Sequence, residues 1–371
     1  MNIPSKKILV LSPFESWPLS QGSIVRTHFM ATHLLKSNSI WFVFRKSAVT
    51  HTLPTQQDIT NSRNRFAQLF NPFLFARLWR LVRREHISLI IVSQIWSGWH
   101  GVLLKLCTGR PLLFDDHNVE YLRLRRMGSI VWPLVALLEF IVCRAADAIV
   151  CVSDVDKGHL VKNLHVTDDK VTVLVNGANV NQLLKSPVPV DVIRAKLGLV
   201  AGERMVLFFG SLQHRPNAQA ARIILQEIAP RLLRSNPEAK IVIAGLGRVS
   251  FLSKQRDDIP ENVNFVGFVD DVTAVIKSAD LVIVPLTAGS GTRYKIIESI
   301  ACGRRVISTS IGAEGLQQHI LGEALIICDD WDAFAQQIAE NLTKEREVPP
   351  TPAFMQTYDW DVIWQNLPLP D

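Results

Sequence analysis

Two cations and a carboxylate follow a glycine-rich turn near residue 290, and these residue types could together bind a phosphorylated ligand. The turn and the start of the next element consist of Gly289, Ser290, Gly291, Thr292, Arg293, Tyr294 and Lys295, with Glu298 three residues on. Glycines let a backbone approach a ligand closely, and the N–H groups at the start of a helix attract phosphate. Arg293 and Lys295 would oppose the helix dipole unless an anion is held beside them. We therefore predict a phosphate site, with Thr292 capping a helix that runs from Arg293 to about Ala301.

Glu298 would lie on a helix that is otherwise apolar at this point. A carboxylate beside a phosphate suits two hydrogen bonds from the vicinal hydroxyls of a ribose. Arg293, Lys295 and Glu298 are therefore candidates for catalytic and donor-binding roles. A plainer interpretation stays open for each of them: a solvated first turn that carries an Arg and a Lys, and an exposed helix glutamate.

Polar residues and glycines also follow other apolar runs that have the length of buried strands. In the first half of the chain they are Gly22, Asp116, His117 and Asn118, and in the second half Gly210, Arg215 and Gly245. A histidine between an Asp and an Asn at a strand end is polar enough for a site, although His117 could equally be a surface residue of a loop. Gly22 and Gly245 could be ordinary turn glycines.

Short apolar runs alternate with helical patterns along the whole chain, which is typical of parallel sheets covered by helices. The runs are 8–11, 40–44, 89–92, 112–114, 148–152 and 171–175 in the first half, and 205–209, 240–244, 263–266, 280–284, 305–308 and 324–327 in the second. They predict an α/β chain with two doubly wound, Rossmann-like domains. Ligands bind beyond the carboxyl ends of the strands in such sheets, which is where the candidate residues lie.

Two proline-containing breaks divide the chain. The segment 181–191 loses its periodicity and carries two prolines, and 347–352 carries three. We therefore expect an N-terminal domain at 1–185, a second domain at 186–347 and a tail at 348–371. The tail contains a short amphipathic pattern at 358–364 that needs a surface to cover.

The run from Gly289 to Leu316, GSGTRYKIIESIACGRRVISTSIGAEGL, resembles the donor-site signature of the retaining glycosyltransferases of family 4. The resemblance implies the GT-B fold, in which two Rossmann-like domains face a central cleft and a C-terminal helix crosses back to the first domain. Glu298 matches the second glutamate of the family's E-x7-E pattern, which implies a contact with the nucleotide ribose. Ser290 stands where the first glutamate should be. The backbone N–H groups of Gly289, Ser290 and Gly291 are the expected substitutes.

The resemblance extends over nearly the whole chain and assigns further roles. Ser211 and Pro216 stand where the family places an Arg and a Lys on the diphosphate, so Arg215, Arg293 and Lys295 are expected to compensate. The other implied donor contacts are Gly210, Gly245, Phe268, Val269 and Thr292. On the acceptor side, the resemblance implies Gly22 in a glycine loop and His117 near the anomeric carbon, with Asp116 and Asn118 beside it.

The implied reaction moves a sugar from a nucleotide diphosphate sugar to an acceptor hydroxyl with retention of configuration, as in bacterial cell-surface or exported polysaccharide and glycolipid synthesis. Basic side chains and helix N–H groups would stabilise the leaving diphosphate without a required metal. No cofactor is expected beyond the nucleotide sugar itself. Two alternatives stay open: a nucleotide-sugar 2-epimerase of the same fold, and a sugar-nucleotide-binding subunit without activity.

Charge is distributed unevenly along the chain. Residues 1–185 carry 22 basic against 12 acidic side chains, whereas 186–371 carry 18 against 22. The stretch 63–84 holds six arginines, interleaved aromatic residues and no acid, and Arg123, Arg125 and Arg126 extend the positive patch. Such a stretch suits an anionic lipid interface, although an ordinary helix packing on the sheet describes part of it. No basic recognition helix or base-stacking motif is present, so a nucleic acid is not an expected partner.

Two further features bear on where the protein acts. The five cysteines form no C-x-x-C pair, which favours a reducing compartment. The apolar stretch 130–152 is interrupted by Pro133, Glu139, Arg144 and Asp147, so it predicts a buried helix followed by a strand rather than a membrane span. We expect a cytoplasmic protein, peripheral on the inner face of the plasma membrane, whose acceptor is a saccharide or a lipid-linked saccharide.

Overall fold

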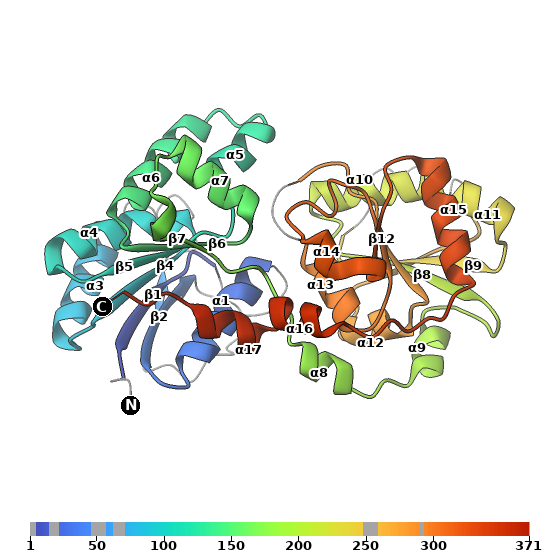
Figure 1. Ribbon diagram of the computed structural model, residues 1–371, viewed down its shortest axis with the longest axis horizontal. Helices are drawn as coiled ribbons and strands as arrows, with labels where there is room; N and C mark the ends of the chain where they lie inside the picture. The colour runs from blue at the N-terminus through green and yellow to red at the C-terminus, as the bar shows by residue number, and fades with distance from the viewer. Residues whose placement is uncertain are drawn as a thin grey trace. The chain divides into compact units, whose positions relative to one another are not determined.

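The computed structural model describes residues 5–14, 22–45, 57–61, 71–247, 259–289 and 293–370. The chain divides into two compact units (Figure 1), which we call unit 1 (Met1–Asn176 with Asp361–Asp371) and unit 2 (Gly177–Trp360). The division falls after Asn176 rather than after residue 185. The reason is that α8 (Val180–Lys185) packs on α13 (Tyr294–Ala301) of unit 2. The tail divides likewise, with only its part from Asp361 onward belonging to unit 1.

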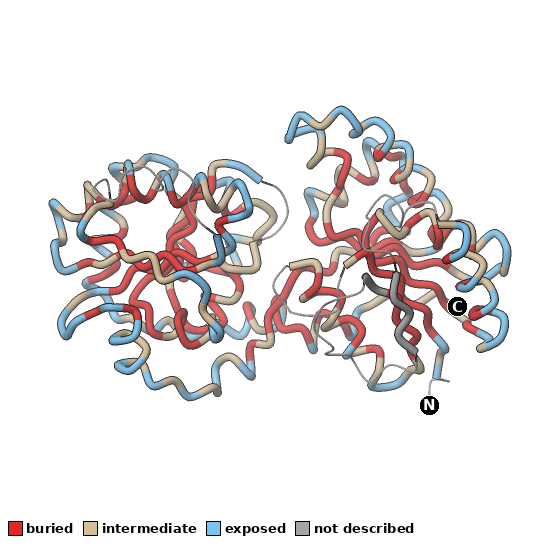
Figure 2. The backbone as a smooth tube through the Cα atoms, turned by 180° about the vertical axis from the view of Figure 1, so that it is seen from behind, coloured by how far each residue is buried: buried red, intermediate tan, exposed pale blue. Residues whose placement is uncertain are grey.

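Unit 1 is built on a parallel sheet of seven strands in the order β3-β2-β1-β4-β5-β6-β7. The strands are β1 (Lys7–Leu11), β2 (Ser39–Arg45), β3 (Gln57–Asn61), β4 (Leu89–Ser93), β5 (Leu112–Asp115), β6 (Ala148–Cys151) and β7 (Val171–Val173). Successive side chains of a strand point to opposite faces. Leu9, Leu11, Ile90 and Val92 accordingly belong to one large apolar cluster together with residues of the covering helices. Figure 2 shows the centre of this sheet, to which β1, β4 and β5 belong, as buried.

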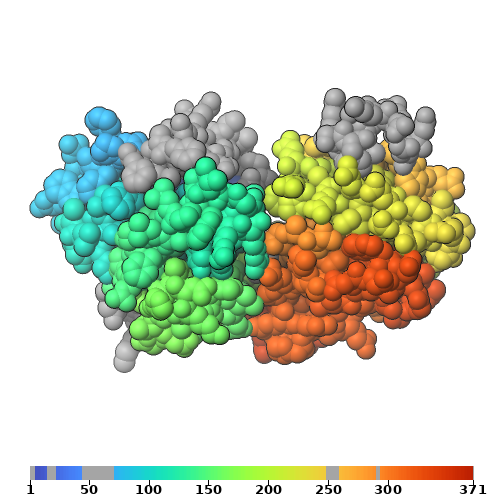
Figure 3. Space-filling model, turned by 90° about the horizontal axis from the view of Figure 1, so that it is seen from above, coloured from blue at the N-terminus to red at the C-terminus, as the bar shows by residue number. Residues whose placement is uncertain are grey.

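The helices of unit 1 that the structure describes follow the strands in βα order. They are α1 (Gly22–Leu34), α3 (Pro72–Arg84), α4 (Gly98–Thr108), α5 (Glu120–Arg126), α6 (Trp132–Ala145) and α7 (Asp154–Asn163), with 3-10 turns at Ile95–Ser97, Asp168–Lys170 and Trp364–Asn366. α4 packs against both α3 and α6, and α5 packs against α6. Figure 3 looks onto the side of unit 1 on which α5, α6 and α7 lie, coloured from teal to green.

Unit 2 repeats the same order of strands in a six-stranded parallel sheet, β10-β9-β8-β11-β12-β13. Its strands are β8 (Arg204–Phe209), β9 (Ala239–Ala244), β10 (Val263–Gly267), β11 (Leu281–Val284), β12 (Val306–Ser308) and β13 (Leu325–Ile327). Its remaining helices are α9 (Val190–Lys196), α10 (Arg215–Ile223), α11 (Ala229–Ser235), α12 (Val272–Ser278), α14 (Gln318–Leu321), α15 (Trp331–Leu342) and α16 (Pro352–Tyr358). A π turn at Ile224–Ile228 joins α10 to α11, a 3-10 turn covers Gly322–Ala324, and α17 (Trp360–Ile363) spans the border between the units.

The predicted α/β architecture with two doubly wound domains is confirmed, and each of the twelve apolar runs overlaps a strand. The sequence did not predict β3, because its residues QDITN form no apolar run and it lies at the edge of its sheet. The stretch 130–152 forms a helix and a strand, as expected. The prediction that this helix is buried was wrong for one of its faces, which exposes Leu134 and Leu137. Within the described ranges, no helix has both the length and the hydrophobicity needed to cross a bilayer.

Candidate functional site

The candidate donor residues of unit 2 gather where the order of its strands reverses. β8 lies between β9 and β11. From β9 the chain continues to β10 at one edge of the sheet, and from β11 it continues through β12 to β13 at the other edge. Such a switch point is the usual ligand site of a doubly wound sheet, because the loops after the two central strands diverge there. The loop after β8 carries Gly210 and Ser211, and the loop after β11 leads through Gly289 to α13.

The side chain of Lys295 joins these two loops. Its Nζ donates a hydrogen bond of 2.9 Å to Oδ1 of Asn217, and it lies 4.6 Å from the centre of the Phe208 ring. Asn217 in turn donates through Nδ2 to the carbonyl of Ser211 at 2.9 Å. Asn217 therefore holds the ammonium group of Lys295 beside the backbone that follows β8.

Two glycines leave room for the cations at this point. Gly210 has a φ of +141°, and a Cβ there would lie 2.9 Å from Nδ2 of Asn217 and 3.0 Å from Nζ of Lys295. Gly289 has a φ of +122°, and a Cβ there would lie 2.7 Å from Nη2 of Arg293. L-residues rarely adopt these backbone conformations, and a side chain would also push the two cations away. The glycines thus let positive charge lie directly against the main chain.

Burial shifts the protonation of both Lys295 and Glu298. Desolvation, and after it the positive charge of Arg293, lower the pKa of Lys295 to about 7, while Glu298 opposes the shift. Desolvation raises the pKa of Glu298 to about 7, against the effect of Lys295. Both side chains nonetheless keep part of their surface accessible to solvent. An anion bound beside Lys295 would restore the charge of its ammonium group, so the pair is suited to a ligand that carries phosphate.

The helix that carries these residues starts one residue later than the sequence predicts. α13 begins at Tyr294, with Arg293 as its N-cap residue in an extended conformation and without a side-chain cap. The prediction of Arg293 as the first helical residue was therefore wrong by one position. The predicted site residues Ser290, Gly291 and Thr292 lie outside the described residues. Glu298 lies one turn after Lys295, on the edge of a helix whose Ile296, Ile297 and Ile300 are buried.

The other predicted donor residues lie at the ends of neighbouring strands or on α10. Gly245 follows β9, and its N–H donates to the carbonyl of Gly267 at 2.7 Å. Phe268 follows β10 with 61% of its surface exposed, and Val269 is half-buried. Their position matches the end of the sheet at which the other candidates lie, since all of these strands are parallel.

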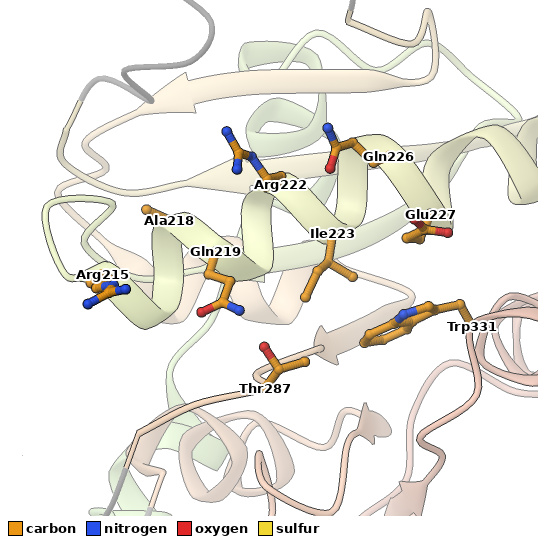
Figure 4. A pocket seen from close by; sticks show the side chains of 9 residues that line it. All are labelled: Arg215, Ala218, Gln219, Arg222, Ile223, Gln226, Glu227, Thr287 and Trp331. Atoms are coloured by element: carbon orange, nitrogen blue, oxygen red, sulfur yellow. The ribbon is translucent and has the colours of Figure 1, made fainter. Parts of the chain in front are cut away.

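Arg215 lies on the first turn of α10 and is exposed. Its side chain lines a hollow of about 580 Å³ on unit 2, together with Gln219, Arg222, Thr287 and Trp331. Figure 4 shows Thr287 and Trp331 on the side of this hollow opposite α10. Thr287 also belongs to the loop that leads to Gly289, so the hollow borders the loop of the predicted donor site.

The candidate histidine of unit 1 belongs to a buried polar network. Nε2 of His117 lies 2.8 Å from Oδ2 of Asp115 and 3.0 Å from Oγ of Ser93. Oγ of Ser93 lies 2.7 Å from Oγ1 of Thr27 on α1. Burial lowers the pKa of His117, partly offset by Asp115, so the neutral imidazole donates from Nε2 to Asp115. Nδ1 of His117 is buried without a hydrogen-bond partner among the described residues, and it is the acceptor nitrogen of that tautomer.

A buried arginine anchors this network. Arg26 of α1 donates from Nε to Oδ1 of Asp115 at 2.9 Å, and from Nη1 to the carbonyl of Leu174 and to Oδ1 of Asn176. Its guanidinium also lies 4.9 Å from the centre of the Trp364 ring. Burial alone would raise the pKa of Asp115, but the positive charge of Arg26 and the hydrogen bonds from His117 and Arg26 outweigh it and hold this pKa at about 2. Asp115 is therefore a fixed anion that sets the tautomer of His117.

The remaining predicted residues of unit 1 surround the histidine. Asp116 is buried, and desolvation together with Glu139 and Asp156 raises its pKa well above the ordinary value. Its Oδ1 accepts a bond of 3.4 Å from the backbone N–H of Asn118, which is half-buried. Gly22 is the first residue of α1, four residues before Arg26. In the described part of the chain, no three or more His, Cys, Asp or Glu side chains are grouped so as to hold a metal ion.

Sequence reasoning missed Arg26, Ser93 and Asn217. Arg26 and Asn217 lie close in the sequence to the predicted residues Gly22 and Arg215, but nothing in the sequence marks them as buried or as partners of Asp115 and Lys295. The one available signal for Arg26 is a basic residue on the apolar side of a helix, with Ile24 and Met30 buried on the same helix.

Both halves of the chain resemble known proteins. Residues 203–344 match the model of the family described as Glycosyl transferases group 1, and residues 46–182 match that of Glycosyltransferase Family 4. The chain is 27% identical over 278 residues to a D-inositol 3-phosphate glycosyltransferase of Thermobispora bispora, covering 68% of this chain and 62% of the relative. It is 25% identical over 198 residues to a phosphatidyl-myo-inositol mannosyltransferase of Mycobacterium leprae, covering 51% of this chain and 50% of the relative. The chain thus spans less than two thirds of the length of these two relatives.

Solved structures show the same architecture. Anabaena HepE, solved in complex with UDP and glucose, superposes with a TM-score of 0.73 at 18% identity over 97% of each chain. WaaG, a glycosyltransferase involved in lipopolysaccharide biosynthesis, superposes with a TM-score of 0.67 at 14% identity over 96% of this chain and 94% of that chain. At such identities the likeness establishes the two-domain GT-B fold. Together with the two family models that cover both halves, it shows that this chain belongs to the group 1, family 4 glycosyltransferases.

Proposed function

We propose that this chain transfers a sugar from a nucleotide diphosphate sugar to an acceptor hydroxyl, with retention of configuration. The observation that carries the proposal is the cluster of Lys295, Asn217 and Gly210, with Glu298 one turn further along α13. Lys295 and Arg293 supply charge for a diphosphate at the switch point, and Glu298 can accept two hydrogen bonds from a ribose. HepE, which has the same fold, has been solved in complex with UDP-glucose.

The chemistry assigned to the two units differs. In unit 2, the cations stabilise the negative charge that develops on the leaving diphosphate, and this role does not require a metal ion. In unit 1, Nδ1 of His117 accepts a hydrogen bond from a saccharide hydroxyl, because Asp115 holds the proton of the imidazole on Nε2. The retention of configuration is inferred from the family.

We place the reaction in bacterial cell-surface glycolipid or polysaccharide synthesis, at the inner face of an anionic membrane. One relative is a UDP-Gal:alpha-D-GlcNAc-diphosphoundecaprenol galactosyltransferase of Escherichia coli, 22% identical over 265 residues, covering 69% of this chain and 67% of the relative. The five cysteines are all free thiols, which suits a reducing compartment. The arginine-rich stretch 63–84 supports a contact with anionic lipid.

Calorimetric titration with UDP, GDP and ADP and their sugars tests the donor site. We expect one of these ligands to bind, and Glu298→Ala to weaken it about tenfold or more, since a charged hydrogen bond contributes about 1.5–3 kcal/mol. Glu323→Ala, which removes an exposed carboxylate of the same unit, is the matched control and should bind like the wild type. Equal affinities of the Glu298→Ala variant and the wild type would contradict the assigned site.

The reaction itself is tested by product analysis. With donor and acceptor together, nuclear magnetic resonance should show a product with the anomeric configuration of the donor, formed equally in the presence of EDTA. An inverted product, or a product that EDTA abolishes, would contradict the mechanism. Conversion of the nucleotide sugar alone into its epimer would identify an epimerase instead.

A further inference from the structure

The pair of helices α5 and α6 exposes an unusual number of large apolar side chains. We call residues 120–145 the α5–α6 hairpin. Its connecting turn exposes 93% of Ile130, and α6 exposes 64% of Leu134. Other large apolar side chains that the hairpin exposes are Met127, Val131, Leu137 and Phe140. A cluster of this kind on a protein surface marks a site of interaction rather than random scatter.

α6 is apolar on two opposite faces. One face buries Val135, Val142 and Cys143 against the core of unit 1. The other face carries Leu134, Leu137 and Phe140 and is exposed. A surface helix of a soluble protein is ordinarily polar on its outer side, and a helix that is apolar all round is covered on both sides. The outer face of α6 therefore requires an apolar cover.

The charges of the hairpin indicate which kind of partner covers its apolar surface. Its two acidic residues, Glu120 and Glu139, are both buried. Glu139 accepts hydrogen bonds from the backbone N–H groups of Glu120 and Tyr121, and Glu120 pairs with Arg123. Exposed charge on the hairpin is thus positive and comes from arginines, including Arg125, Arg126 and Arg144. A partner that offers both hydrocarbon and negative charge fits this surface.

An aromatic residue lies where the apolar and basic parts meet. The guanidinium of Arg125 lies 5.3 Å from the centre of the ring of Trp132, which is half-buried at the start of α6. Trp and Arg are suited to the boundary between lipid headgroups and acyl chains, because each has an apolar body and a polar tip. Ile130 and Leu134 lie next to this boundary in the sequence and carry the apolar surface that would enter the acyl region.

We propose that the α5–α6 hairpin is the element that inserts into an anionic lipid surface. α3 has a different role, because it packs Leu74, Leu78 and Leu81 into the core and exposes arginines, with Phe73 as its one large exposed apolar side chain. α3 and the hairpin belong to one set of packed helices, joined through α4. The hairpin thus supplies insertion, and α3 supplies additional positive charge. This inference rests on the proposed function in one respect: the acceptor at the membrane would be a lipid-linked saccharide.

Flotation of the full chain with vesicles tests the inference. The probe is a vesicle of phosphatidylcholine with or without phosphatidylglycerol, compared at low and high salt. We expect the wild type to float with the anionic vesicles. The double variant Ile130→Asp/Leu134→Asp should bind anionic vesicles at least tenfold more weakly than the wild type. The double variant Arg125→Gln/Arg126→Gln should bind them several-fold more weakly. The double variant Arg77→Gln/Arg80→Gln on α3 should lose less vesicle affinity than either hairpin variant.

Controls separate insertion from loss of fold and from self-association. Val192→Asp removes an exposed apolar residue of unit 2 and should bind vesicles like the wild type. Thermal melting shows that each variant folds, and the nucleotide titration shows that its donor site is intact. Full binding by Ile130→Asp/Leu134→Asp would overturn the inference. The inference would also be overturned if the wild type does not float and light scattering shows instead a dimer that Ile130→Asp/Leu134→Asp dissociates.

The two proposals fail separately. Loss of vesicle binding with intact nucleotide binding supports the hairpin as a membrane element. A wild type that binds nucleotide and ignores anionic vesicles contradicts the hairpin and leaves the proposed function standing. A wild type that floats through the hairpin and binds no nucleotide contradicts the proposed function alone.

Discussion

Lys295 and Glu298 are one helical turn apart, and burial brings the pKa of each to about 7 by shifts of opposite sign. At neutral pH each side chain therefore exists partly in its neutral form. In the proposed donor site, the ammonium form of Lys295 is the one expected to bind a diphosphate, since the anion compensates for the desolvation of the charge. The donor site is thus sensitive to pH in a range where an ordinary lysine is fully charged.

This sensitivity predicts how nucleotide affinity depends on pH. The pKa of free Lys295 is about 7, so binding of a nucleoside diphosphate must add a proton above that pH, and affinity should fall as the pH rises from 7 to 9, by up to about tenfold per unit. Lys295→Arg keeps the charge at every pH and should give a flatter profile. Titration calorimetry between pH 6 and pH 9 measures both. Parallel profiles for the two proteins would show that Lys295 does not contact the anion.

The sequence identified the charged residues of this site and missed the residues that position them. Arg293, Lys295 and Glu298 lie within six positions of each other, so their association could be inferred from spacing alone. Asn217 lies 78 positions from Lys295, and Arg26 lies 89 positions from Asp115. Such partners are brought together by the order of strands in the sheet, which local spacing does not encode.

At the scale of elements, α1 is tied to other parts of unit 1 by one buried side chain. Arg26 contacts Asp115 at the end of β5, the carbonyl of Leu174 after β7, and the ring of Trp364 in the C-terminal turn. These three segments meet at the side of the sheet where His117 lies. The arginine thus holds the histidine network and the two ends of the unit 1 chain together.

Removal of this side chain should be costly. Arg26→Met leaves Asp115 as a buried carboxylate without its guanidinium, and breaking a buried ion pair in this way costs about 3–5 kcal/mol. Urea unfolding of the variant and the wild type measures the loss. Arg80→Met, which removes an exposed arginine of α3, should change stability by less than about 0.5 kcal/mol. Similar losses for the two variants would mean that the Arg26 network does not stabilise unit 1.

Elements differed in how well their sequences revealed them. Central strands such as β1, β4 and β11 were predicted because burial on both faces leaves an uninterrupted apolar run. β3 was missed because an edge strand pairs on one side only, so its sequence can be polar. The sequence of α6 is apolar on both sides of the helix, so both sides were expected to be buried. The fold of unit 1 covers only one of them.

At the scale of the whole molecule, the two sheets share the same order of six strands, which reverses between β1 and β4 in unit 1 and between β8 and β11 in unit 2. In unit 2 the loops at this reversal carry Gly210 and Gly289, whereas in unit 1 Asp116 and His117 follow β5, the neighbour of β4. The chain contacts assign α8 and most of the tail to unit 2, so the expected border at residue 185 did not coincide with the observed one. The prolines in the sequence suggested a domain border after α8, but α8 packs on α13 and therefore belongs to unit 2.

Because every candidate donor contact lies between Gly177 and Trp360, a bound nucleotide should stabilise unit 2 selectively. At a ligand concentration 100-fold above its dissociation constant, the stabilisation is about 2.7 kcal/mol, which slows global exchange about 100-fold. Hydrogen exchange followed by mass spectrometry should therefore show slower exchange in β8, β11 and α13, with β1, β4 and β5 unchanged. The Glu298→Ala variant, assayed at the same nucleotide concentration, should lose much of this protection. Equal protection of both sheets would contradict independent unfolding, because it requires the two units to open as one cooperative body.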